Sequence, residues 1–343
     1  KVAHIKFPKP AACGKTPLMA EGLSKSYGSL ESFTDVDLAI DKGSRVVVLG
    51  LNGAGKTTLL RILAGALEAD TGDILPGNGL KVGYFAQEHE TLDTSRTVLE
   101  NMQSAAPQLT DTEARSVLGS FLFSGDDTSK PAAVLSGGEK TRLALASLIV
   151  SSANVLLLDE PTNNLDIHSI GWLERTINAY DATMIIISHD RHFLNQVCTH
   201  IADLDYQQLK IYPGNYDDFM LASVQARQRV EASNAKAKAQ ISDLQEFVRR
   251  FSANASKARQ ATSRKRQLEK IKIEEIRPSS RQNPYIRFEQ AKKLYRSAVT
   301  VDGLSFRYPG ADRDIFTNLK FTIEAEQRVA IIGPNGIGKT TLM

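Results

Sequence analysis

The feature that most constrains the fold of this chain is a glycine-rich loop at residues 50–58, Gly-Leu-Asn-Gly-Ala-Gly-Lys-Thr-Thr. It follows an apolar run at 45–49, typical of a strand, and precedes a helical pattern that starts at Leu59. Strand, loop and helix in this order form a phosphate-binding loop, because glycines let backbone N–H groups turn toward phosphate oxygens at a helix N-terminus. Lys56 can reach the β- and γ-phosphates, and the Thr57 hydroxyl can bind Mg²⁺. The predicted nucleotide-binding residues are Gly50, Asn52, Gly53, Ala54, Gly55, Lys56, Thr57 and Thr58.

The same pattern occurs a second time. Residues 333–341 read Gly-Pro-Asn-Gly-Ile-Gly-Lys-Thr-Thr and follow the apolar run 328–332, which again predicts a strand, a loop and a helix. Thr340 corresponds to Thr57 as a candidate Mg²⁺ ligand. Two copies indicate a nucleoside-triphosphate-binding α/β protein built on a repeat. The predicted contacts of the second loop are Gly333, Asn335, Gly336, Ile337, Gly338, Lys339, Thr340 and Thr341.

A tyrosine precedes each loop at a matching place in the repeat. Tyr27 alone is compatible with simple core packing. Its recurrence as Tyr308 favours an aromatic platform for adenine, since base–aromatic stacking contributes about 1–3 kcal/mol per base.

Composition excludes several classes of protein. Of the 343 residues, 42% are hydrophobic and 24% are charged, as in an ordinary globular protein. The two cysteines, Cys13 and Cys198, are far apart in sequence, which indicates a reducing compartment and no disulfide framework. Apolar runs such as 184–187 are strand-sized and too short to cross a bilayer. We therefore expect a cytoplasmic protein with no membrane domain in this chain.

A further motif, Leu-Ser-Gly-Gly-Glu-Lys, occupies residues 135–140. Ser136 is a good helix N-cap, and Glu139 three residues later gives a capping-box pattern. Gly137 and Gly138 each cost about 0.8–1.0 kcal/mol relative to Ala inside a helix. Their presence favours a place where the backbone approaches a ligand closely.

Two neighbouring acids complete the set of motifs. Asp159 and Glu160 end the apolar run 155–158, which predicts a buried parallel strand with both acids at the ligand-binding edge of the sheet. Together these motifs resemble those of the ATP-binding cassette (ABC) superfamily. The resemblance implies an α/β P-loop NTPase cassette with a RecA-like core, an antiparallel β part and a helical signature subdomain. The helical spacing of residues 93–124 marks the expected place of that subdomain.

The resemblance also implies roles for single residues. Asp159 holds Mg²⁺ directly or through water, and Glu160 orients the attacking water or accepts its proton. His189, at the end of another apolar strand, corresponds to the switch histidine that contacts the γ-phosphate. Gln87 corresponds to the glutamine that senses Mg²⁺ and the water. Residues 163–166 resemble the loop that communicates across the cassette dimer.

In this superfamily, the phosphate loop of one cassette faces the signature of another. We therefore expect Ser136 and Gly138 to serve the ATP held by Lys339. The chain ends at Met343, just after the second phosphate loop. We expect it to be a fragment whose partner cassette belongs to the same full-length chain. Whether the fragment alone hydrolyses ATP is left open.

The segment between the two loops is strongly basic. From residue 218 to 290 there are sixteen Lys and Arg against eight Asp and Glu. Apolar positions at Ile241, Leu244 and Val248 predict one helix of an antiparallel pair. A solvated spacer is the alternative, but acids are scarce near the expected tip, which favours contact with RNA phosphate. The candidate RNA contacts are Lys257, Arg259, Arg264, Lys265 and Arg266.

Two cassettes joined by a basic helical linker resemble the ABC-F family of ribosome-associated ATPases, in particular its YbiT-type branch. The resemblance implies a linker that enters the ribosome and approaches tRNA. The expected divisions are a linker tail at 1–17, a first cassette at 18–216, a basic hairpin at 217–290 and the start of a second cassette at 291–343.

Other interpretations remain open from the sequence. The chain could be the ATP-binding subunit of an ABC transporter whose membrane domains lie on another chain, or a DNA-repair ATPase of the superfamily. Residues 5–7 repeat the pattern of residues 286–288, so the first 17 residues also resemble the end of another inter-cassette linker. That repeat is compatible with two related genes joined through residues 155–166.

Overall fold

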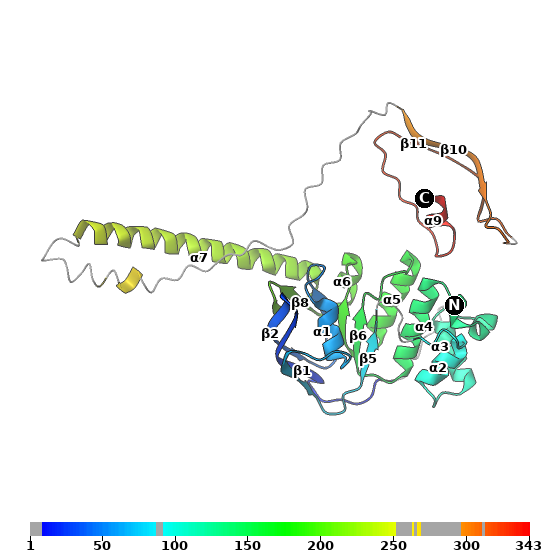
Figure 1. The fold of residues 1–343 in the computed structure, drawn as a ribbon, viewed down its shortest axis with the longest axis horizontal. Helices are drawn as coiled ribbons and strands as arrows, with labels where there is room; N and C mark the ends of the chain where they lie inside the picture. Colours follow the sequence, from blue (N-terminus) through cyan, green and yellow to red (C-terminus); the bar gives the residue numbers. More distant parts are fainter. Residues whose placement is uncertain (1–8, 87–91, 252–262, 264–265, 269–295, 311–312) are drawn as a thin grey trace.

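The fold is described from a computed structural model (Figure 1), which covers residues 9–86, 92–251, 263, 266–268, 296–310 and 313–343. Within these ranges, no helix is both long and apolar enough to cross a membrane.

A six-stranded sheet forms the centre of the first cassette. In spatial order its strands are β5 (Val82–Phe85), β6 (Val155–Asp159), β7 (Thr183–Ile187), β3 (Arg45–Leu49), β8 (His200–Asp205) and β9 (Gln208–Pro213). All pairs are parallel except β8 with β9. Every residue of β6 and β7 is buried, because both faces of the sheet are covered.

Successive strand residues enter two different cores. Leu156 and Leu158 pack in the core formed with helices α4 (Gly137–Val150), α5 (Ile167–Ala179) and α6 (Arg191–Val197). Val155 and Leu157 pack in the other core, with α1 (Lys56–Leu63). This alternation follows from the period of two in a strand. Asp159 ends β6 and Glu160 follows it, so both acids lie at the carboxyl edge of the sheet.

An antiparallel sheet closes the second core. Its strand order is β2 (Leu30–Ile40), β1 (Leu18–Tyr27) and β4 (Thr71–Pro76). Phe33 of β2 is 1% exposed and packs with the residues of α1. This contact brings the start of β2 beside the first phosphate loop.

The predicted helical subdomain is confirmed. It contains α2 (Val98–Ala105), α3 (Asp111–Ser120) and the N-terminal part of α4. Reciprocal capping boxes start all three helices, and the one at α4 is the predicted pair Ser136 and Glu139.

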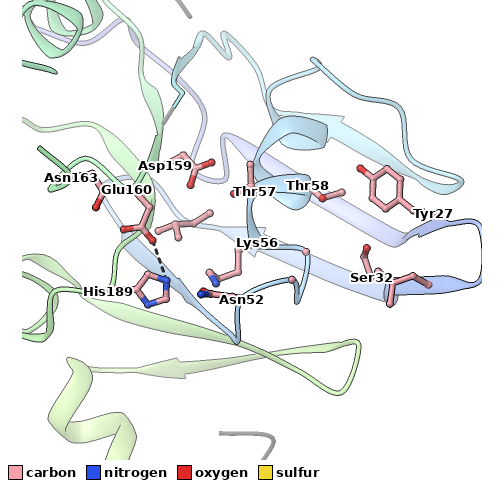
Figure 2. Close-up of a pocket in the computed structure, with 14 residues that line it drawn as sticks. Tyr27, Ser32, Asn52, Lys56, Thr57, Thr58, Asp159, Glu160, Asn163 and His189 are labelled. Atoms are coloured by element: carbon pink, nitrogen blue, oxygen red, sulfur yellow. Dashed lines mark ion pairs between the residues drawn. The ribbon is translucent and has the colours of Figure 1, made fainter. Parts of the chain in front are cut away.

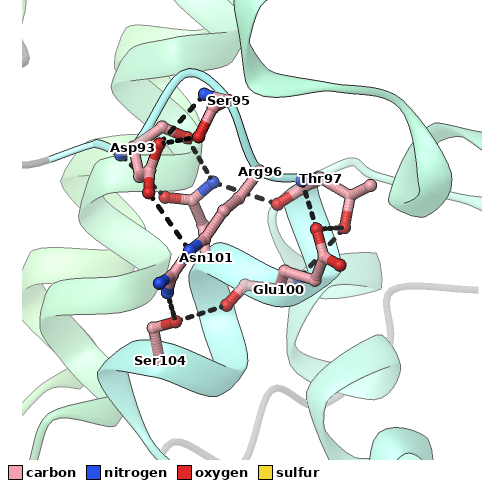
Figure 3. A network of polar contacts seen from close by, with 7 residues as sticks. All are labelled: Asp93, Ser95, Arg96, Thr97, Glu100, Asn101 and Ser104. Atoms are coloured by element: carbon pink, nitrogen blue, oxygen red, sulfur yellow. Dashed lines mark hydrogen bonds and ion pairs between the residues drawn. The ribbon is translucent and has the colours of Figure 1, made fainter.

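A buried asparagine organises the start of this subdomain (Figure 3). The Asn101 side chain donates to the carbonyls of Asp93 at 2.9 Å and Thr97 at 3.0 Å, and accepts from the Asp93 N–H at 3.0 Å. The carbonyl of Arg96 accepts a bond of 2.8 Å from the N–H of Ala132. The turn before α2 is therefore fixed to the segment that leads into the signature.

Trp172, the single tryptophan of the sequence, lies where the helical subdomain meets α5. Its ring meets Phe121 edge to face with centroids 4.9 Å apart, and its Nε1 donates to the Ser120 carbonyl at 3.0 Å. The side chain is 7% exposed.

A long helix, α7 (Tyr216–Phe251), leaves the cassette (Figure 1). It corresponds to the first predicted linker helix. Most of the predicted returning helix lies outside the described residues.

The second repeat forms a hairpin of β10 (Ser297–Phe306) and β11 (Phe316–Glu324), followed by the short helix α9 (Lys339–Leu342). The prediction of a strand at 328–332 is wrong, since these residues form no strand. Its apolar pattern predicts a sheet strand, but strand formation needs a paired neighbour for its backbone groups. In the described ranges no strand pairs with this segment, and Ile332 is 76% exposed.

Candidate functional site

The two glycine-rich loops have the same backbone and the same lysine arrangement. Gly55 and Gly338 adopt φ values of 93° and 98°, a left-handed conformation that favours glycine, and each precedes a helix. The ammonium of Lys56 donates to the carbonyls of Gly50 and Leu51, both at 3.0 Å. Lys339 donates to the corresponding carbonyls of its own loop at 2.8 Å. The repeat predicted from sequence is thus present in the geometry of both loops.

The first loop opens into a cavity of about 520 Å³ (Figure 2). The predicted residues that line it are Tyr27, Asn52, Gly53, Gly55, Lys56, Thr57, Thr58, Asp159, Glu160 and His189. Gly50 and Ala54 do not line it. A Cβ atom at Gly50 would lie 2.8 Å from the Leu204 carbonyl, so this glycine permits close packing on β8.

Asp159 lies at the carboxyl end of β6, beside Thr57 in this cavity (Figure 2). It is 1% exposed, and neither carboxylate oxygen has a hydrogen-bond partner among the described residues. Burial raises its pKa above the ordinary value of 3.8, while the neighbouring Thr57 hydroxyl and, less strongly, Arg61 and Lys56 act in the opposite direction. An unpaired buried carboxylate next to a hydroxyl fits the hard oxygen ligands that Mg²⁺ prefers. Asp159 and Thr57 are therefore suited to hold that ion, which would neutralise phosphate charge.

Glu160 and His189 meet across the cavity. The Nε2 atom of His189 lies 3.3 Å from Oε1 of Glu160 (Figure 2). Burial raises the pKa of Glu160 above 4.5, and the neighbouring His189 lowers it less strongly. The Glu160 backbone has a φ of 52°, and its N–H donates to the Ile187 carbonyl at 2.9 Å. These contacts place a carboxylate with increased basicity opposite the phosphate loop.

Four further lining residues are absent from the predicted site residues: Leu30, Ser32, Asn163 and Ile187. Leu30 and Ser32 belong to β2, which reaches the loop only through tertiary packing. A Cβ atom at Gly55 would lie 3.0 Å from the Ser32 Cβ. No local sequence pattern predicts this contact between Gly55 and Ser32.

The tyrosines before the loops reach their cavities in different ways. The Tyr27 ring is 50% exposed at the rim, with the ammonium of Lys25 5.8 Å from its centroid. Lys25 and Ser26 both bond the Asp70 carboxylate at 2.7 Å, and these bonds lower the Asp70 pKa to about 2. The Tyr308 hydroxyl instead forms a 3.0 Å hydrogen bond with Thr341 in the second loop.

The second loop lies opposite the signature of the first cassette. A cavity of about 420 Å³ is lined by Ser136, Gly137 and Gly138 on one side and by second-repeat residues on the other. The predicted residues on that side are Tyr308, Asn335, Gly336, Gly338, Lys339, Thr340 and Thr341. Of the other predicted residues, Gly333, Ile337 and Glu139 do not line this cavity. Glu139 accepts hydrogen bonds from the Ser136 N–H at 2.8 Å and hydroxyl at 2.7 Å.

Asn335 makes direct contacts between the repeats. Its side chain donates to the Asn164 carbonyl at 2.6 Å, and its N–H donates to Asp166 Oδ2 at 3.1 Å. The other Asp166 oxygen accepts from the Ser169 N–H at 2.8 Å, where Asp166 caps α5. A single carboxylate therefore serves both a helix cap and the contact between repeats.

Some predicted residues lie outside the described ranges. These are Gln87, Lys257, Arg259, Arg264 and Lys265. Arg266 is described and exposed.

Comparisons with known proteins agree with this architecture. Residues 33–163 and 316–343 match a family model described as ABC transporter, and residues 202–288 match a second model with the same description. The chain is 42% identical to "Probable ATP-binding protein YbiT" of Escherichia coli O157:H7, covering 95% of this chain and 68% of that protein. It is 36% identical to "Uncharacterized ABC transporter ATP-binding protein YkpA" of Bacillus subtilis, covering 95% and 67%. It is 32% identical to "ABC transporter F family member 2" of Arabidopsis thaliana, covering 94% and 54%.

Proposed function

Because the chain belongs to the ABC-F family of ATP-binding cassette proteins, we propose that it hydrolyses Mg²⁺-ATP to act on the ribosome. Lys56 and the loop around it bind the phosphates, and Asp159 with Thr57 holds Mg²⁺. Tyr27 stacks on adenine. Glu160 takes up the proton of the attacking water, and His189 contacts the γ-phosphate.

The observation that carries the ATPase proposal is the shared cavity of Lys56, Asp159, Glu160 and His189. It combines a cation for phosphate, an unpaired carboxylate for a metal and a second carboxylate with a raised pKa. Phosphoryl transfer depends mainly on such positioning and charge stabilisation. The second composite pocket, between Ser136 and Lys339, supports ATP-dependent closure of one cassette onto the other.

The ribosomal role rests on family membership and on the basic linker. Residues 218–290 carry sixteen Lys and Arg against eight Asp and Glu, and α7 extends 36 residues from Tyr216. A helix of that length spans about 54 Å, enough to carry basic residues far from the cassette. Ribosomal RNA and tRNA phosphates are polyanions suited to such a surface. This place of action implies a cytoplasmic protein.

Glu160→Gln tests both parts of the proposal. The change keeps the side-chain shape but removes the base, so hydrolysis should fall by about 10²- to 10⁴-fold while ATP binding persists. Trapped ATP should then hold the protein on ribosomes during sucrose-gradient sedimentation. The exposed Glu68→Gln variant is the matched control and should behave as wild type.

The ATPase assignment and the ribosomal role can be contradicted separately. Unchanged hydrolysis in Glu160→Gln would contradict the assigned base. Loss of hydrolysis with no ATP-dependent ribosome sedimentation would contradict the translational role and leave the ATPase assignment intact.

A further inference from the structure

The first turn of α7 is bonded to helix α6, which begins close to the switch histidine. β7 ends at Ile187, and His189 follows two residues later. Asp190 then caps α6, because its Oδ1 accepts from the Phe193 N–H at 3.1 Å. Only one residue separates His189 from the first residue of α6, so the start of α6 follows the position of His189.

Asp217 is the residue of α7 that α6 holds. Its Oδ1 accepts from Arg191 Nη2 at 2.6 Å, and its Oδ2 accepts from Asn195 Nδ2 at 3.0 Å. Its backbone N–H donates in return to Asn195 Oδ1 at 3.1 Å. Arg191 and Asn195 are four residues apart and share one face of α6. Three hydrogen bonds thus fix one residue of α7 to one helix face.

Aromatic contacts surround these hydrogen bonds. The Arg191 guanidinium lies 5.2 Å from the centroid of the Tyr216 ring. Phe219, one turn further along α7, is 2% exposed and meets Tyr212 edge to face at 5.1 Å. The base of α7 is therefore anchored to the cassette on more than one side.

The same contact borders the phosphate loop. A cavity of about 540 Å³ is lined by Asn52 and Lys56 from the loop, by His189, and by Arg191 and Tyr216 from the helix contact. A change at the nucleotide thus has a short physical route to the base of α7.

We propose that Asp217 is a positioning residue through which nucleotide in the Lys56 pocket sets the direction of helix α7. This inference rests on the proposed ATP site. A γ-phosphate beside His189 competes with the 3.3 Å contact between His189 and Glu160. Helix α6 moves with His189, and Asp217 transmits that movement to α7. Since 36 residues of helix span about 54 Å, a tilt of about 5° at the base displaces the far end by about 5 Å.

The neighbouring acid provides a matched control. Asp218 is bonded within its own turn: its Oδ2 accepts from the Asn215 N–H, and its N–H donates to Asn215 Oδ1, both at 3.0 Å. Asp218→Ala therefore weakens the start of α7 and leaves the Asp217 bonds to α6 in place. Asp217→Ala removes the two side-chain bonds to α6, from Arg191 and Asn195. It keeps the backbone bond to Asn195 and the contacts of Asp218. Because Arg191 and Asp217 are exposed, their ion pair contributes little to folding, and both variants should fold.

The test measures the direction of α7 directly. In a background with Cys13→Ser and Cys198→Ala, spin labels are placed on Glu31→Cys in β2 and Ala239→Cys in α7, both exposed positions. Pulsed electron–electron resonance then gives the distance distribution without nucleotide, with Mg²⁺-ADP and with Mg²⁺ and adenylyl imidodiphosphate. Fluorescent-nucleotide titration measures nucleotide binding in the same proteins. Lys339→Ala is present in all of them, so that only binding at the Lys56 pocket is measured.

We expect the distance to shift by several ångströms with the triphosphate analogue in the unmodified background and in Asp218→Ala. Asp217→Ala should bind nucleotide within about threefold of the background but give a broad distribution that nucleotide does not change. A normal shift in Asp217→Ala, or no shift in the background despite binding, would overturn the proposal. Absence of nucleotide binding in the background would instead overturn the proposed ATP site.

Discussion

Asp159 illustrates the conflict between stability and function at the scale of a single residue. Its carboxylate is buried with no hydrogen-bond partner among the described residues. Desolvation disfavours the charged form, which is why the pKa is raised. The folded protein therefore binds a proton at Asp159 more readily than the unfolded chain does. The contribution of Asp159 to the free energy of unfolding falls as pH rises above 3.8.

Asp159→Asn should therefore stabilise the nucleotide-free protein near neutral pH. The melting temperature without nucleotide should rise by a few degrees because an unfavourable charge is removed. The further rise caused by Mg²⁺-ATP should be lost, since the metal ligand is gone. Differential scanning fluorimetry with ATP, with and without Mg²⁺, measures both effects. A variant that keeps the Mg²⁺-dependent rise would contradict the assigned ligand.

The raised pKa of Glu160 should set the acid limb of the pH–rate profile of ATP hydrolysis. Only its ionised form can accept a proton, and burial raises its pKa above 4.5. Activity should therefore fall on acidification at an apparent pKa above 4.5. His189→Ala removes a charge that lowers the Glu160 pKa, so the acid limb of the residual activity should move to higher pH. Steady-state rates between pH 5 and 8 check this, and a shift to lower pH would contradict the coupling.

At the scale of elements, local pattern predicted the phosphate loops, the buried strands and the helical subdomain. Continuous apolar runs such as 155–158 are enough to predict a strand buried on both faces. The place of Ser32 beside Gly55 could not be predicted, because it depends on packing between two sheets. The run 328–332 had the right pattern and formed no strand, since pairing is a tertiary condition.

The two signature glycines differ in how closely the second repeat approaches them. A Cβ at Gly138 would lie 2.6 Å from Asn335 Nδ2 and 2.9 Å from the Asn164 carbonyl. A Cβ at Gly137 would make only ordinary contacts, at 3.4 Å or more. Gly138 is therefore the position where a side chain would push the repeats apart.

Gly138→Ala should weaken the composite pocket by displacing Asn335. Alanine favours helix by about 1 kcal/mol over glycine, which opposes the cost of its 2.9 Å approach to the Asn164 carbonyl of the same cassette, so the melting temperature should change little. Nucleotide affinity at the Lys339 pocket, measured with Lys56→Ala present, should fall at least about tenfold if about 1.4 kcal/mol of contact is lost. Gly137→Ala is the control and should retain affinity. Equal losses in both variants would contradict the role of close approach.

On the scale of the whole molecule, charge is unevenly distributed. The net charge is only +3, yet residues 218–290 carry an excess of eight positive charges. The cassette provides the candidate energy-using site, and the linker provides the candidate polyanion-binding surface. Composition could predict that division, but the direction of α7 depends on the tertiary contacts of Asp217.

Neutralising the candidate RNA contacts should weaken binding to ribosomal RNA and flatten its salt dependence. Each lost phosphate contact lowers the slope of log K against log salt by about 0.7–0.9, so five losses give a change of about 4. Filter binding across a salt series measures the slope. The five changed residues are Lys257, Arg259, Arg264, Lys265 and Arg266. An unaltered slope would favour a solvated spacer.

The matched control removes five exposed basic residues from the cassette. It should leave the slope nearly unchanged, because these residues lie outside the linker. The residues are Lys42, Lys81, Lys130, Arg175 and Lys210.

Trp172 gives the protein an intrinsic fluorescence probe. Because no other tryptophan exists in the sequence, its emission comes entirely from the joint between α5 and the helical subdomain. Rotation of that subdomain would stretch the bond from the indole to Ser120 and change the edge-to-face contact with Phe121. Stopped-flow fluorescence of the unlabelled chain therefore tests whether nucleotide binding rotates this subdomain.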